Sequence, residues 1–149
     1  MKEKSTDELN KQLENTKPQD IKKYYKENID SLNSKKSFYY YVKDVLAKKN
    51  ILLKDVYIAS GLGDSYGGQL IRMEKVTKNR DVIIKICLAG HFLLDEINTA
   101  LKLYGMIPLY AKDQRDACII VAVNNRIYDI DEIDEILKEH NFESLSKDE

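Results

Sequence analysis

Apolar residues recur at every third or fourth position along most of this chain, which is the spacing of one face of an α-helix. Polar and turn-forming residues separate these runs, so the pattern predicts a series of short helices. In the central and C-terminal parts the expected helices cover residues 37–50, 53–60, 65–75, 80–89, 94–104, 114–124 and 131–140.

One of these segments also fits a strand. Ile119 to Val123 is rich in β-branched residues, and Asn124-Asn125 can turn the chain back through Ile127-Tyr128 as a β-hairpin. We favour the helix because an internal repeat aligns the same segment with Ile84 to Leu88, ahead of another helix start.

This repeat relates two segments that lie 35 to 36 residues apart. Arg80-Asp81-Val82-Ile83-Ile84 recurs as Arg115-Asp116-Ala117-Cys118-Ile119, and Asp95-Glu96-Ile97 recurs as Asp131-Glu132-Ile133. A period of this size is the length of one helical hairpin, which cannot bury its apolar face without a neighbour. The sequence therefore predicts an all-α fold whose C-terminal part consists of stacked helical hairpins.

The N-terminal part is more polar than the rest. Ser5 and Glu8 have the spacing of a capping box before a weak helix, and a second, amphipathic helix is expected from Ile21 to Leu32. Ser34-Lys35-Lys36 follows as a predicted linker. We expect a polar helical extension over residues 1–34, a central domain over 35–104 and a helical repeat extension over 105–149.

Composition and charge narrow the classes of function. Among 149 residues, 43% are hydrophobic and only 6 are Gly and 2 Pro, which favours a folded, helix-rich chain. No apolar run approaches the roughly 20 residues of a membrane span, so we expect a cytoplasmic protein with no membrane partner.

Residues 1–80 hold 17 Lys and Arg against 11 Asp and Glu, whereas residues 81–149 hold 7 against 14. The excess of positive charge in residues 1–80 is suited to contacts with nucleic-acid phosphates. Two ordinary solvated surfaces of opposite charge would give the same numbers of charged residues.

The segment from Leu53 to Lys75 has the pattern of a helix-turn-helix, with Gly61 in the turn and apolar residues on either side to fix the angle between the helices. The residues from Ala59 to Tyr66, then Ile71 to Lys75 and Asn79 to Asp81, resemble the lambda-repressor-like (XRE/Cro class) family of bacterial and phage regulators. The extension through Tyr104 to Asp116 is similar to a subgroup of that family from Firmicutes.

The resemblance implies a lambda-repressor-like helix-turn-helix core whose second helix reads double-stranded DNA. Gln69 can form a bidentate pair with adenine, and Ser65 and Tyr66 can reach a phosphate or a base edge. Each of the candidate residues also has an ordinary interpretation as a solvated polar side chain. The candidate DNA-binding residues are Ser65, Tyr66, Gln69, Arg72, Lys75, Lys78 and Arg80.

Two adjacent glycines interrupt the predicted reading helix. Gly67 and Gly68 weaken a helix by about 1 kcal/mol each relative to alanine. They also predict a surface without side chains, where the helix backbone approaches DNA closely or where the helix frays.

The expected function is that of a bacterial DNA-binding transcriptional regulator, with the acidic C-terminal helices available for a homodimer or a protein partner. The alternative is a protein-interaction adaptor that keeps the fold without sequence-specific reading of DNA. An enzyme is not expected, because no catalytic, metal-ligand or phosphate-loop spacing is present. Cys87 and Cys118 are expected to be buried, reduced thiols, and no metal site or cofactor is predicted.

Overall fold

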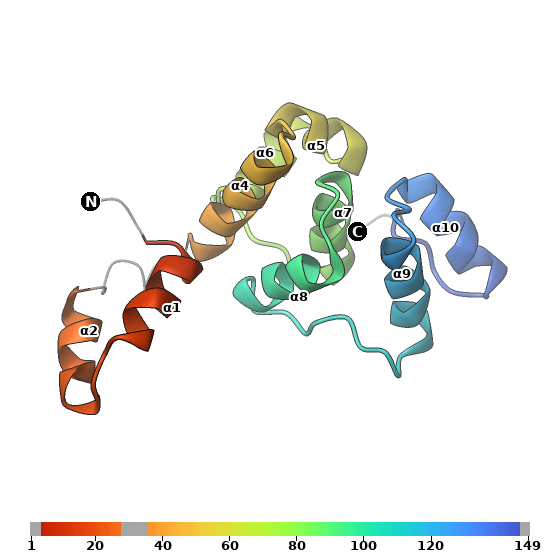
Figure 1. Ribbon diagram of the computed structural model, residues 1–149. Helices are drawn as coiled ribbons and strands as arrows, with labels where there is room; N and C mark the ends of the chain where they lie inside the picture. Colours follow the sequence, from red (N-terminus) through yellow and green to blue (C-terminus); the bar gives the residue numbers. More distant parts are fainter. Residues whose placement is uncertain (1–3, 28–35, 147–149) are drawn as a thin grey trace.

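The computed structural model describes residues 4–27 and 36–146, and every regular element in these two stretches is a helix. The prediction of an all-α fold is confirmed for this part of the chain, including residues 114–124, where a β-hairpin is the alternative. Figure 1 shows α1 and α2 at one end, α9 and α10 at the other, and the remaining helices between them. The helices are α1 (Thr6–Glu14), the 3-10 helix η1 (Pro18–Asp20), α2 (Ile21–Glu27), α4 (Ser37–Lys49), α5 (Leu53–Ser60), α6 (Asp64–Ile71), α7 (Arg80–Ala89), α8 (Leu94–Leu103), α9 (Gln114–Asn124) and α10 (Ile130–Glu139).

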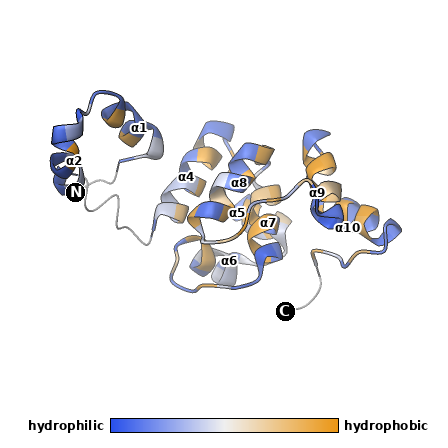
Figure 2. Cartoon of the chain, turned by 90° about the horizontal axis from the view of Figure 1, so that it is seen from below, coloured by the Kyte–Doolittle hydropathy of each residue, from blue (hydrophilic) through white to orange (hydrophobic). Residues whose placement is uncertain are grey.

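The N-terminal helices stand apart from the main hydrophobic core. The Ser5 hydroxyl caps α1 by accepting a hydrogen bond from the Glu8 amide, as the sequence predicts. Both helices are largely hydrophilic (Figure 2), and neither contributes a residue to the core cluster. Tyr24 of α2 is nevertheless buried. The remainder of the predicted second helix and most of the predicted linker lie in residues 28–35, outside the described residues.

Local capping explains where several helices begin. The side chains of Asn79, Asp113 and Asp129 each accept a hydrogen bond from a backbone amide in the first turn of α7, α9 and α10. Such caps satisfy amide donors that have no partner within the helix.

Among the described helices, none is both long and apolar enough to cross a bilayer.

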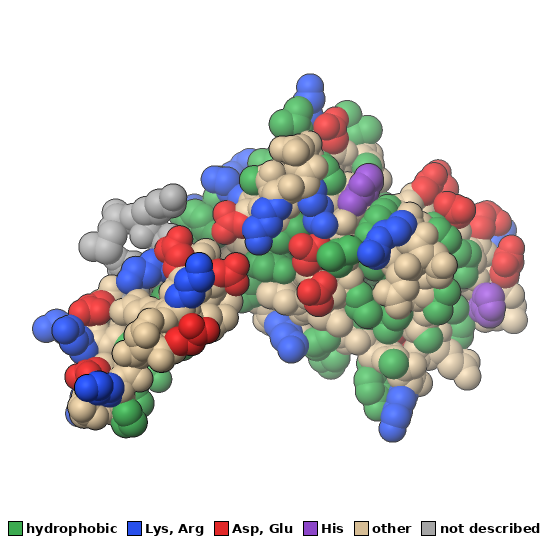
Figure 3. Space-filling view, viewed as in Figure 1, with side chains coloured by type: hydrophobic (Ala, Val, Ile, Leu, Met, Phe, Trp, Pro, Cys, Tyr) green, Lys and Arg blue, Asp and Glu red, His purple; other side chains and the backbone are tan. Residues whose placement is uncertain are grey.

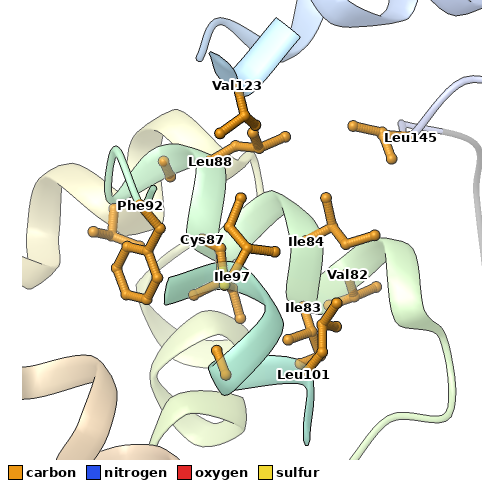
Figure 4. Close-up of a cluster of buried hydrophobic side chains, with 14 of the residues drawn as sticks. Val82, Ile83, Ile84, Cys87, Leu88, Phe92, Ile97, Leu101, Val123 and Leu145 are labelled. Atoms are coloured by element: carbon orange, nitrogen blue, oxygen red, sulfur yellow. The ribbon is translucent and has the colours of Figure 1, made fainter. Parts of the chain in front are cut away.

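Helix α7 forms the centre of the core. All its residues except Arg80, Asp81 and Lys85 are buried, so it has neighbours on every side. The helices α5 and α8 pack against α7, and the cluster in Figure 4 shows Val123 of α9 and Leu145 of the tail after α10 reaching it.

The two repeats share hydrogen bonds that the sequence comparison does not reveal. The Asn98 side chain accepts from the Leu109 amide at 2.9 Å, and its counterpart Asp134 accepts from the Leu145 amide at 2.6 Å. In the same way, Arg80 Nε donates to the Ile107 carbonyl and Arg115 Nε donates to the Glu143 carbonyl. Each repeat is therefore a helical hairpin followed by a tail that closes back onto it.

Reciprocal ion pairs join the two hairpins. Arg80 binds Asp116 through two hydrogen bonds of 3.0 and 2.7 Å, and Arg115 binds Asp81 through two of 3.0 and 2.8 Å. The arginine of each repeat thus contacts the aspartate of the other. Reciprocal contacts of this kind characterise a two-fold relation, whereas a stack related by translation would join two different surfaces. The hairpins α7–α8 and α9–α10 are accordingly related by an approximate two-fold axis.

We expect the folded state to lose stability at alkaline pH. Burial raises the pKa of Tyr41 to about 12 from its ordinary value of 10, and full burial raises the pKa of Cys87. Between pH 10 and 12 the unfolded chain releases protons that the folded chain keeps, so the free energy of unfolding falls as pH rises. Urea denaturation at a series of pH values should show this fall.

The fall should be shallower in a Tyr41→Phe variant, which has no phenol to ionise. Tyr40→Phe, at an exposed neighbouring position, is the control. Equal slopes for the parent and the Tyr41→Phe variant would contradict the assignment to Tyr41.

Candidate nucleic-acid interface

A short turn joins α5 to α6 and fixes the angle between them. Gly61 ends α5 with a φ of 76° and Gly63 precedes α6 with a φ of 81°, both in the left-handed region that glycine tolerates. The buried Ser60 hydroxyl donates to the Tyr57 carbonyl and accepts from the Leu62 amide. The Ser60 side chain therefore stabilises the turn through hydrogen bonds to its backbone. Helix α6, which follows the turn, buries Leu70 and Ile71.

The adjacent glycines of α6 allow two close contacts. A Cβ atom on Gly67 would lie 3.0 Å from Cδ1 of Tyr57, and one on Gly68 would lie 2.8 Å from Nη1 of Arg72. Both glycines are buried, so the expectation of a surface without side chains is wrong: the protein's own Tyr57 and Arg72 cover this surface. Gly67 lets Tyr57 of α5 pack closely on α6, and Gly68 leaves room for the Arg72 guanidinium.

The outer face of α6 brings three of the predicted residues together. Ser65, Gln69 and Arg72 follow one another at intervals of four and three residues, which places them on one side of the helix. Ser65 is exposed and the other two are partly exposed. Tyr66 differs, because it packs against the hydrophobic core.

The helix ends earlier than the sequence predicts. Met73 adopts a left-handed conformation with a φ of 61°, and the amides of Glu74 and Lys75 both bond to the Gln69 carbonyl. This arrangement closes α6 at Ile71 and places Lys75 in the following loop.

Arg72, at the end of α6, forms an exposed ion pair with Glu74. Its Nε and Nη2 atoms lie 2.9 and 3.1 Å from the two carboxylate oxygens. The hydrogen bond from Arg72 lowers the pKa of Glu74, so the carboxylate stays charged beside the guanidinium. A phosphate must compete with this carboxylate to bind Arg72.

The loop after α6 carries two exposed cations, Lys75 and Lys78. The loop is anchored at Thr77, whose amide donates to the Tyr104 hydroxyl at 3.0 Å and whose hydroxyl accepts from the Asn79 amide at 3.0 Å. This anchoring holds the two lysines next to the end of α6.

Arg80 has a different environment from the other predicted cations. Its guanidinium binds Asp116 and also donates to the carbonyls of Ile107 and Pro108. Every nitrogen of the side chain therefore has an acceptor within the protein. The structure places Arg80 at the junction of the two hairpins, so the open part of the candidate interface comprises Ser65, Gln69, Arg72, Lys75 and Lys78.

Helix α4 adds basic residues that the sequence did not single out. Lys36 lies close enough to Glu74 to lower the pKa of that carboxyl, after the larger effect of Arg72. Tyr39 interacts with Arg72 and lies beneath the ammonium group of Lys43 at 5.0 Å. Nothing local in the sequence indicates that α4 packs beside Arg72, because the two are more than 20 residues apart.

The cysteine, histidine and acidic side chains do not form a further candidate site in the part of the chain that the structure describes. Within residues 4–27 and 36–146, no group of three or more His, Cys, Asp or Glu side chains is placed to hold a metal ion. Cys87 is buried, as expected, whereas Cys118 is partly exposed, which corrects the expectation that both thiols are buried. The imidazole of His91 stacks on Tyr128, with ring centres 4.8 Å apart.

The chain matches no protein-family model, no curated protein and no solved structure. Its function is therefore inferred from the arrangement of α5, α6 and the loop that follows them.

Proposed function

We propose that this protein is a bacterial DNA-binding transcriptional regulator with a lambda-repressor-like helix-turn-helix core, in which α5 and α6 form the helix-turn-helix. The observation that carries the proposal is the open face of α6, where Ser65, Gln69 and Arg72 lie beside a loop that carries Lys75 and Lys78. A glutamine amide is suited to a bidentate pair with adenine in the major groove. The lysines are suited to phosphate contacts on either side of the groove.

The distribution of charge supports the same orientation. Lys36 and Lys43 add positive charge on the neighbouring helix α4. Acidic side chains gather over α10 at the other end of the molecule, as Figure 3 shows. A duplex that binds at α6 would therefore meet the basic part of the chain and avoid the acidic part.

A fluorescence-anisotropy titration tests the proposal, using a random duplex and the protein's own promoter region at two salt concentrations. Lys75→Ala and Lys78→Ala should each weaken binding to both duplexes and reduce the salt slope by about 1, because each removes one phosphate contact. Gln69→Ala should cost about 1–3 kcal/mol of binding free energy on the preferred sequence only.

Lys138→Ala is the matched control, since Lys138 is also exposed but lies on the acidic helix α10. The proposal fails if the parent protein does not bind duplex DNA at low salt. It also fails if a combined Arg72→Ala, Lys75→Ala and Lys78→Ala variant binds as tightly as the parent.

A second candidate function is that of a protein-interaction adaptor. Exposed apolar side chains favour it: Ile58 of α5 is 78% exposed, and Leu52 and Val76 are each more than half exposed. Apolar groups in this position suit a protein surface better than a phosphate backbone. The same titration separates the candidates, because an adaptor of this kind does not bind the duplex even at low salt.

A further inference from the structure

The first repeat shows what covers the outer face of a hairpin. Ile83, Ile86 and Gly90 lie on one side of α7 at intervals of three and four residues, and both isoleucines are fully buried. A Cβ atom on Gly90 would lie 2.9 Å from Cδ2 of Leu46, so α4 reaches this side of the hairpin where α7 ends. Helix α4 also packs against α8, where Tyr41 interacts with the Thr99 side chain.

Among the residues that the structure describes, no helix covers the corresponding face of the second repeat. The counterparts of Ile83, Ile86 and Gly90 on α9 are Cys118, Val121 and Asn125. Cys118 is partly exposed, Val121 is 59% exposed and Asn125 is exposed. Hydrophobic side chains are visible over α9 in Figure 3. We call the side chains of Cys118 and Val121, together with Glu132 on α10, the open repeat face.

The first repeat also indicates which charge would complement this face. The Lys49 ammonium of α4 lies 2.9 Å from Oε1 of Glu96 on α8. The counterpart of Glu96 on α10 is Glu132, which is exposed. A helix that covered the second hairpin as α4 covers the first would therefore bring a cation to Glu132 and aliphatic side chains to Val121.

We propose that the open repeat face binds one helix of a partner protein, a helix that carries aliphatic side chains one turn apart followed by a lysine, as α4 does. Charge complementarity and the internal counterpart both point to this occupant. A folded second copy of the chain does not offer such a helix, because its own α4 is already packed against α8 and against Gly90 at the end of α7. The proposal does not depend on DNA binding.

A synthetic peptide with the sequence of residues 36–50 is a suitable probe, because it contains Val42, Val45, Leu46 and Lys49. Fluorescence anisotropy of the labelled peptide against the full chain gives its affinity. The peptide should also slow the reaction of Cys118 with a thiol reagent. Cys87 does not interfere, because it is fully buried and burial raises its pKa.

Val121→Asp should remove peptide binding, and Glu132→Lys should weaken it at least tenfold through repulsion from the peptide lysine. A peptide with Lys49→Glu should bind the Glu132→Lys protein better than the parent peptide does, since the reversal restores the opposite charges. Ile58→Asp is the matched control, because it places the same charge at an exposed apolar position of α5. Val121→Ser replaces Val121→Asp if the aspartate variant does not fold.

Three results would overturn the proposal. The first is the absence of peptide binding at millimolar concentration, and the second is equal loss of binding in the Val121→Asp and Ile58→Asp variants. The third is a parent protein that is dimeric by light scattering and becomes monomeric in the Val121→Asp variant, which would assign the face to a second copy.

Discussion

Replacing Asp116 with alanine is expected to lower the free energy of unfolding by about 3–5 kcal/mol, because it removes one partner of a buried ion pair. Asp116 is only 4% exposed, and its carboxylate accepts hydrogen bonds from the Arg80 guanidinium and from the Tyr110 amide. Without it the Arg80 charge would stay partly buried between the hairpins with no opposite charge. Urea denaturation followed by circular dichroism measures the loss.

Asp81→Ala is the matched control, since it removes the aspartate of the reciprocal ion pair between Arg115 and Asp81. Asp116 is the more buried carboxylate, with its side chain 6% exposed against 23% for Asp81, and it also accepts a hydrogen bond from the Tyr110 amide, which would lose its partner. The loss should therefore be smaller for Asp81→Ala. Equal losses, or a loss below about 1 kcal/mol for Asp116→Ala, would contradict the view that the buried pair holds the hairpins together.

Phe92→Ala should have an effect of similar size, with a loss of about 3–5 kcal/mol in the free energy of unfolding. Phe92 is fully buried after the end of α7, and its ring closes over the position where a Cβ atom of Gly90 would lie. Leu46 of α4 approaches the same point from the other helix. Removal of the ring leaves a cavity where α4 meets α7, and urea denaturation again gives the cost.

The repeat supplies the control for this substitution as well. Ile127 is the counterpart of Phe92 in the second hairpin, but it is only partly buried. Ile127→Ala should therefore destabilise the protein less than Phe92→Ala. The packing described for Phe92 is wrong if the two variants unfold at the same urea concentration.

Local sequence patterns predicted most helices well. The expected bounds of α5, α7 and α9 agree with the structure, because side-chain periodicity and the caps at Asn79 and Asp113 act within a few residues. The repeat also resolved α9 correctly, where the β-branched residues alone favour a strand. The end of α6 was predicted too late, since the left-handed turn at Met73 is not marked by a glycine.

The sequence predicted the positions of the candidate residues in the fold only in part. Ser65, Gln69, Arg72, Lys75 and Lys78 lie on or after α6 as the spacing indicates, because that spacing is a local property of a helix and its loop. Arg80 follows the same cations in the sequence, yet its acceptor Asp116 lies 36 residues away. A list of neighbouring basic residues cannot distinguish an arginine that faces solvent from one that a distant carboxylate holds.

The sequence by itself thus determined that the chain is helical, where most of its helices begin, and that its C-terminal part contains two related hairpins. Only the tertiary structure decided that the hairpins pair reciprocally through Arg80, Asp81, Arg115 and Asp116, and that α4 covers one hairpin and leaves the other open. The physical reason is the range of the interactions. Periodicity and capping join residues within one or two helical turns, whereas ion pairing and burial depend on which helices meet in the folded chain.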